Sequence, residues 1–160
     1  MEGGRLPREP EEGSFGVDDA LGIASRVHAA QVDKSGRPYI EHVRRVADAV
    51  ADEGPDAVMA GLLHDVVEDG DLTLADLRAA GVPANVITAV DALTKRPGEP
   101  YLEAVARASA NPLARVVKLA DNTDNADETR LSQLDAATAA RLRRKYQQAR
   151  VVLLERPDAQ

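Results

Sequence analysis

The sequence predicts an all-α protein, a single helical bundle of about eight helices. Apolar residues, mostly Ala, Leu and Val, make up 44% of the chain, whereas aromatic residues make up only 2%. This composition favours close helix packing over aromatic cores. Apolar positions recur at helical spacing along most of the chain, and no segment shows the alternation of a β-strand. A length of 160 residues suits one domain.

The first two helices are separated by a clear turn signal. Residues 1–16 lack apolar periodicity and are rich in Gly and Pro, so we expect a flexible tail before a domain of residues 17–157. An apolar stripe indicates a first helix over about 17–32. The turn sequence DKSGRP follows, and a second stripe indicates a helix over about 39–53.

The middle of the chain predicts three helices. Pro55 suits a helical first turn, and the segment to about Asp69 is apolar nearly all round, which places this third helix at the centre of the bundle. Thr73 can cap a short helix that Gly81 ends. A further helix is expected over about 83–95.

The C-terminal part predicts three more helices. Two of them cover about 101–109 and 112–125, after the loop sequence RPGEP. A looser stretch, DETRLSQLD, precedes a long final helix over about 135–156. This helix contains Ala and Leu and could supply the face of a homo-oligomer.

Composition excludes several classes of function. The chain has no cysteine, which excludes disulfides, thiolate metal sites and a cysteine nucleophile, and which fits a reducing compartment. It carries 27 acidic against 20 basic residues, a formal charge of −7, so nucleic acid and anionic membranes are not expected partners. Neither a membrane-spanning run nor a leader is apparent, and we expect a cytoplasmic protein with a small-molecule partner.

The sequence LLHDVVED predicts a metal site. His64, Asp65, Glu68 and Asp69 crowd the end of the most apolar helix, where the helix dipole already disfavours negative charge. A divalent cation would neutralise these acids. His64 and Asp65 diverge by about 100° on a regular helix, so further ligands must come from other helices.

Three other residues are candidates for those ligands. They are His28 in the first helix, His42 in the second, and Asp121 in VVKLADNTDNAD, where an apolar helical stretch turns abruptly acidic. Helical spacing alone leaves the choice among them open. Lys118 lies one turn before Asp121 and could pair with it.

Three motifs in order carry a family resemblance. They are H-x-x-Q-x-x-K-S-G-x-P-Y-I-x-H, from His28 to His42, then LLHDVVED, then KLADNTDN. Together they resemble the hydrolase domain of the RelA/SpoT family of alarmone enzymes, which is an HD-domain metal-dependent phosphohydrolase. The resemblance runs from about residue 18 to the final helix. It implies an HD-domain helical bundle.

The resemblance also implies a ligand set and a cofactor. By position, His28, His64, Asp65 and Asp121 correspond to metal ligands, with coordination positions left for water. The family typically uses manganese, and a mixed nitrogen and oxygen set suits Mn²⁺, iron or zinc better than calcium. His42 then has a structural or supporting role. The bound ion would activate a water molecule for attack on a phosphorus atom.

Other site residues follow from the same resemblance. Glu68 and Asp69 correspond to a catalytic acid pair that orients or deprotonates the water. Lys34, Ser35 and Asn125 correspond to substrate contacts. Alternatives stay open for several of these residues, because His28 could be a packed core histidine and Lys34 or Asn125 could simply be solvated.

The expected reaction is removal of the 3′-pyrophosphate from guanosine tetra- or pentaphosphate. The chain resembles the short members that only hydrolyse, since it has no room for a nucleotide-synthesising domain. Two positions depart from the family pattern: Arg37, where an acid is common, and Asp124, where His or an aromatic residue is common. The alternatives are an HD hydrolase of another nucleotide and a catalytically silent nucleotide-binding module.

Overall fold

The fold is all-α, as the sequence predicts. A computed structural model describes residues 15–155, so residues 1–14 of the predicted tail and residues 156–160 lie outside the described range. No helix in this range is both long and apolar enough to cross a lipid bilayer. Between residues 15 and 155 the elements are α1 (Val17–Val27), α2 (Tyr39–Ala49), a 3₁₀ turn η1 (Ala51–Glu53), α3 (Pro55–Leu63), α4 (Val66–Asp69), α5 (Leu74–Ala80), α6 (Ala84–Leu93), α7 (Tyr101–Ser109), α8 (Pro112–Asn125), α9 (Glu128–Leu131) and α10 (Ala136–Leu154).

The structure differs from the predicted helices in several places. The predicted third helix is broken into α3 and α4 at His64 and Asp65, and the loose stretch after α8 contains the short α9. α1 ends at Val27, before His28, rather than near residue 32. Phe15, placed in the tail by the sequence, packs against the core.

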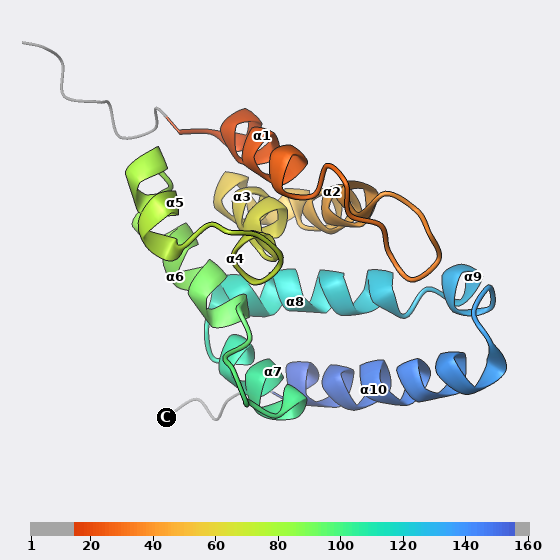
Figure 1. The fold of residues 1–160 in the computed structure, drawn as a ribbon. Coiled ribbons are helices and arrows are strands. Elements are labelled where there is room, and N and C mark those ends of the chain that lie inside the picture. Colours follow the sequence, from red (N-terminus) through yellow and green to blue (C-terminus); the bar gives the residue numbers. More distant parts are fainter. Residues whose placement is uncertain (1–14, 156–160) are drawn as a thin grey trace, which may run out of the picture.

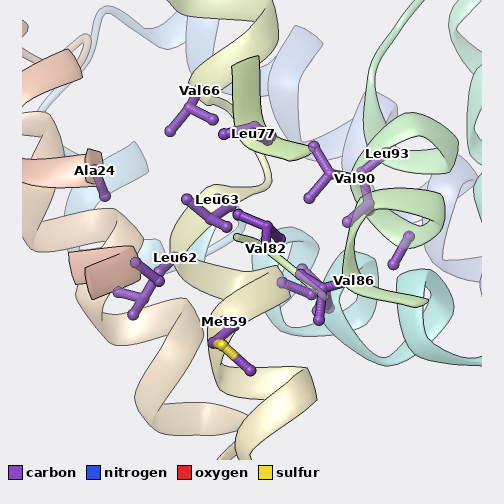
Figure 2. Packing of buried hydrophobic residues seen from close by; sticks show 14 of the residues in the cluster. Ala24, Met59, Leu62, Leu63, Val66, Leu77, Val82, Val86, Val90 and Leu93 are labelled. Carbon is purple, nitrogen blue, oxygen red and sulfur yellow. The ribbon is translucent and has the colours of Figure 1, made fainter. Parts of the chain in front are cut away.

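α3 is the centre of the bundle, as its all-round apolar sequence predicts. It packs against α1, α2, α6 and α8, and α8 in turn lies between the α1–α3 group and α10 (Figure 1). Figure 2 shows Met59, Leu62 and Leu63 of α3 among apolar side chains of neighbouring segments. These neighbours include Ala24, Leu77, Val82, Val86, Val90 and Leu93.

The close approach of α2 and α3 depends on Gly61. A Cβ atom at this position would lie 3.1 Å from the Cα atom of Ala47 and 3.4 Å from its backbone nitrogen. His42 lies on α2, and His64 follows Gly61 by three residues. A glycine on α3 therefore lets the two helices that carry these histidines pack with their backbones in contact.

Substitution of Gly61 by Ala should destabilise the protein. The new methyl group would press on the backbone of Ala47, and overpacking of this kind costs about 1–3 kcal/mol. Gly22→Ala in α1 is the matched control. Its Cβ would meet only the flexible end of Arg26, at 3.6 Å, so it should raise the free energy of unfolding by about 0.5–1 kcal/mol. Chemical denaturation measures both, and equal stabilisation by the two changes would contradict this account.

Candidate metal centre

The break between α3 and α4 brings His64 and Asp65 together. Asp65 has φ −112° and ψ 0°, outside the helical region, whereas His64 is still helical. As a result the Nε2 atom of His64 lies 3.0 Å from Oδ2 of Asp65. Two adjacent residues that would diverge on a continuous helix therefore face the same point.

Two other helices complete a cluster of four ligand-type residues. The Nε2 atom of His42, from α2, lies 2.9 Å from Oδ1 of Asp121, from α8. The same Asp121 oxygen lies 3.4 Å from Nε2 of His64. One nitrogen or oxygen atom from each of His42, His64, Asp65 and Asp121 lies within 4.8 Å of all the others. This spacing allows the four residues to share one ion.

Both imidazoles present the nitrogen that a metal requires. The Nδ1 atom of His64 lies 2.6 Å from the carbonyl oxygen of Gly61, and Nδ1 of His42 lies 2.5 Å from Oδ2 of Asp124. These oxygens can only accept, so both Nδ1 atoms donate, and neutral rings then carry the lone pair on Nε2. The Nε2 atom of His64 is buried without a hydrogen bond to any described residue. An orphaned nitrogen among carboxylates fits a divalent cation.

The buried charges strongly shift the pKa values of the cluster. Burial opposes ionisation, but a protonated His64, the form expected when no metal is bound, lowers the pKa of Asp65 to about 2. Lys118, whose Nζ atom lies 3.0 Å from Oδ2 of Asp121, holds the pKa of that carboxyl well below its usual range. Burial lowers the pKa of His64, yet the two carboxylates raise it well above its usual value. The acids are thus ionised at neutral pH and require positive charge beside them.

His28, which the resemblance gives as a ligand, lies outside this cluster. Its Nδ1 atom donates to Oε1 of Gln31 over 2.7 Å, and Nε2 of Gln31 donates to Oδ2 of Asp69 over 3.1 Å. The ring of Tyr39 contacts both His28 and His42, with centroid distances of 5.0 and 5.2 Å. The structure therefore places His42, not His28, in the four-residue cluster, because His42 lies within α2 and reaches Asp121 of α8, whereas His28 follows the end of α1 and contacts Gln31.

The predicted catalytic acids lie one helical turn beyond Asp65. Glu68 and Asp69 are on α4, and their side chains reach the surface. Partial burial and the negative charge of Asp65 raise the pKa of both carboxyls above their usual values. A carboxylate with a raised pKa is a better proton acceptor. Their catalytic role stays a prediction.

A cavity of about 280 Å³ lies beside the cluster. Tyr39 and Asn125 line it, and each also contacts a cluster carboxylate. The Tyr39 hydroxyl donates to Asp65, and Nδ2 of Asn125 donates to Oδ1 of Asp121 over 3.2 Å. The cavity wall includes all three residues predicted to contact substrate, namely Lys34, Ser35 and Asn125.

Several lining residues have no role in the sequence analysis. Tyr39 precedes His42 by three residues in the PYIEH segment, and this helical spacing could have indicated it. Arg130, from α9, and Tyr146, from α10, arrive from distant segments, so spacing carries no signal for them. The apolar part of the wall consists of Val32, Leu131, Leu134, Leu142 and Tyr146.

Most of the chain matches one known protein family. The family described as the HD domain matches residues 20–155, a range that includes all four cluster residues. The chain belongs to the HD-domain family. Its match covers α1 to α10 apart from the first turn of α1, so the predicted HD-domain bundle is confirmed.

This HD domain is similar to segments of much longer curated proteins. It is 38% identical over 121 residues to a GTP pyrophosphokinase of Streptomyces coelicolor, covering 68% of the chain and 14% of that protein. It is 34% identical over 137 residues to a probable guanosine-3′,5′-bis(diphosphate) 3′-pyrophosphohydrolase of Synechocystis, covering 78% of the chain and 17% of that protein. The chain therefore spans less than a fifth of these relatives.

A solved structure confirms the fold of the HD domain. It belongs to a metazoan ortholog of SpoT, described as hydrolysing ppGpp, and is similar to this chain with a TM-score of 0.74. The similarity covers 96% of this chain and 91% of that one at 22% sequence identity. The two domains share one architecture.

Removal of His42 should abolish tight metal binding, whereas removal of His28 should not. Metal-stripped protein would be titrated with Mn²⁺ and the binding followed by calorimetry. We expect His42→Ala to weaken the affinity by more than the roughly 10–100-fold typical of residues that merely surround a site. His28→Ala, an equally buried histidine, is the matched control and should stay within about threefold of the wild type. The reverse order of effects would restore His28 as the ligand.

Proposed function

We propose that this HD domain is a divalent metal-dependent phosphohydrolase that removes the 3′-pyrophosphate from guanosine tetra- or pentaphosphate. One observation carries the proposal: a cation-fitting cluster adjoins, through Tyr39 and Asn125, a cavity that also holds the cations Lys34 and Arg130. A phosphorylated ligand would meet positive charge there despite the overall charge of −7. Similarity to relatives named for this reaction supports the choice of substrate.

The donor set of the cluster supports a transition metal. His42 and His64 supply two imidazole nitrogens, and Asp65 and Asp121 supply carboxylate oxygens. Such a mixed set suits Mn²⁺, Fe²⁺ or Zn²⁺ better than Ca²⁺, and we propose Mn²⁺. A bound ion of this kind supplies Lewis acidity, which neutralises phosphate charge and lowers the pKa of water.

Residues of the chain then position the reactants and move the proton. Glu68 orients the attacking water and Asp69 accepts its proton, while Gln31 orients Asp69 through the hydrogen bond to its Oδ2 atom. Lys34 and Ser35 hold the phosphate chain. The water oxygen forms a new bond to phosphorus as the bond from phosphorus to the 3′-oxygen of the nucleoside breaks. The 3′-oxygen takes up a proton and pyrophosphate is released, so no covalent intermediate with the protein forms. Positioning and charge neutralisation account for the rate.

The apolar wall of the cavity suits the nucleoside part of the substrate. Tyr146 offers an aromatic face, and three leucines exclude water around it. Small-molecule sites typically combine such a wall with a few polar groups that fix orientation. Lys34, Ser35 and Asn125 are polar groups of this cavity, and Asn125 contacts the cluster through Asp121.

Purified protein reloaded with Mn²⁺ should release pyrophosphate from guanosine tetraphosphate. The metal-stripped protein and the His64→Ala variant should release none above background, because the cluster then lacks its ion. Asp69→Asn should keep the metal and lose at least about 100-fold in kcat, as expected for removal of a general base. Ion-exchange chromatography of the nucleotide products measures all four samples.

The same assay distinguishes the alternatives. A panel of other nucleotides and phosphomonoesters is run in parallel. Turnover of one of these alone would keep the metal chemistry and replace the substrate. Binding of guanosine tetraphosphate without turnover, by protein that holds stoichiometric Mn²⁺, would contradict the enzyme and favour a nucleotide-binding module.

A further inference from the structure

His42 depends on a carboxylate outside the metal cluster. Its Nδ1 atom lies 2.5 Å from Oδ2 of Asp124, and the carboxylate can only accept this hydrogen bond. The bond fixes the ring orientation and leaves the Nε2 lone pair in the cluster, 2.9 Å from Asp121. Position 124 is also one of the two positions at which the sequence departs from the family pattern.

Asp124 is itself held from two sides. Nε of Arg45 lies 2.8 Å from its Oδ1 atom, and Nη2 of Arg130 lies 3.1 Å from its Oδ2 atom. Arg130 also donates to the backbone carbonyl of Asp124. The Arg130 side chain is 13% exposed, against 42% for Arg45. Arg45 holds both carboxylate oxygens, because its Nη2 atom also lies 3.2 Å from Oδ2, but it is the more exposed partner. Arg130 is less exposed, so solvent screens its pairing with Asp124 less.

Arg130 continues to the turn that carries the predicted phosphate contacts. Its Nη1 atom lies 3.7 Å from Oδ2 of Asp33. Oδ1 of Asp33 accepts hydrogen bonds from the backbone nitrogen and hydroxyl of Ser35, at 2.8 and 2.6 Å, and from the backbone nitrogen of Arg37, at 3.0 Å. Asp33 thus shapes the turn, and Arg130 ties the turn to Asp124. Arg130 also lines the cavity beside Lys34.

We propose that Asp124 and Arg130 are positioning residues that link the metal ligand His42 to the Lys34–Ser35 turn, so that metal affinity depends on an arginine outside the four-residue cluster. The inference rests on the metal site of the proposed function. It goes further because it assigns a role to Asp124, one of the two positions at which the sequence departs from the family pattern. The link also couples two binding events. If an anion that binds Arg130 in the cavity changes the affinity of the cluster for the metal ion, the metal ion changes the affinity for that anion by the same factor.

The test measures Mn²⁺ affinity from the EPR signal of unbound Mn²⁺, which requires no turnover. Arg130→Met should weaken binding about tenfold and Asp124→Asn about 10–100-fold, the range for residues that orient a metal-ligating histidine. Arg130→Lys keeps a cation beside Asp124 but lacks the guanidinium fork that also reaches Asp33, so it should weaken binding, though less than Arg130→Met does.

Arg143→Met is the matched control. Arg143 pairs with Glu128 at the surface, with Nε to Oε1 at 2.8 Å, and its loss should change Mn²⁺ affinity by less than about twofold. Thermal unfolding of the metal-free variants reports whether each one is folded, and Asp124→Asn carries the test if Arg130→Met is not. Wild-type affinity in both folded variants would overturn the link while leaving the metal site intact. A wild type that binds no Mn²⁺ would overturn both.

Discussion

The fold of this domain is constrained by the burial of two ionised carboxylates, Asp65 and Asp121, where three helices cross. A buried charge without a compensating partner is too costly to retain. The surrounding chain supplies such partners. Lys118 pairs with Asp121 from the same helix, and His42 and His64 approach from α2 and α3. The contact of α2 with α3 at Gly61 and the break after Leu63 both serve this arrangement.

The same helices that compensate the charge also line the neighbouring cavity, where we propose that the substrate binds. Tyr39 begins the helix that carries His42, and Asn125 ends the helix that carries Asp121. Each lines the cavity and contacts a cluster carboxylate. Metal ligands and cavity wall are therefore one helical turn apart on shared helices. A rigid relation between ion and substrate follows from helix geometry rather than from a mobile loop.

Much of this was predictable from the sequence. Helical periodicity predicted the bundle and the central position of α3. The acids in LLHDVVED and KLADNTDN predicted that His64, Asp65 and Asp121 share one ion, and the structure brings these three residues together. The choice between His28 and His42 was not predictable from spacing, because both lie on apolar helix faces. It depends on tertiary packing: α2 brings His42 to Asp121 of α8, whereas His28 follows the last residue of α1 and lies beside Gln31. The break at Asp65 and the position of Arg130 beside Asp124 also depend on tertiary packing, so helical spacing in the sequence could not predict them.

The most direct test of the metal centre is a crystal structure of the Mn²⁺-loaded protein, with anomalous diffraction recorded at the manganese absorption edge. The account predicts one strong peak between α2, α3 and α8. The Nε2 atoms of His42 and His64 and one oxygen each of Asp65 and Asp121 should lie about 2.0–2.3 Å from it. A peak coordinated by His28 in place of His42, or a fully loaded crystal with no peak at this crossing, would contradict it.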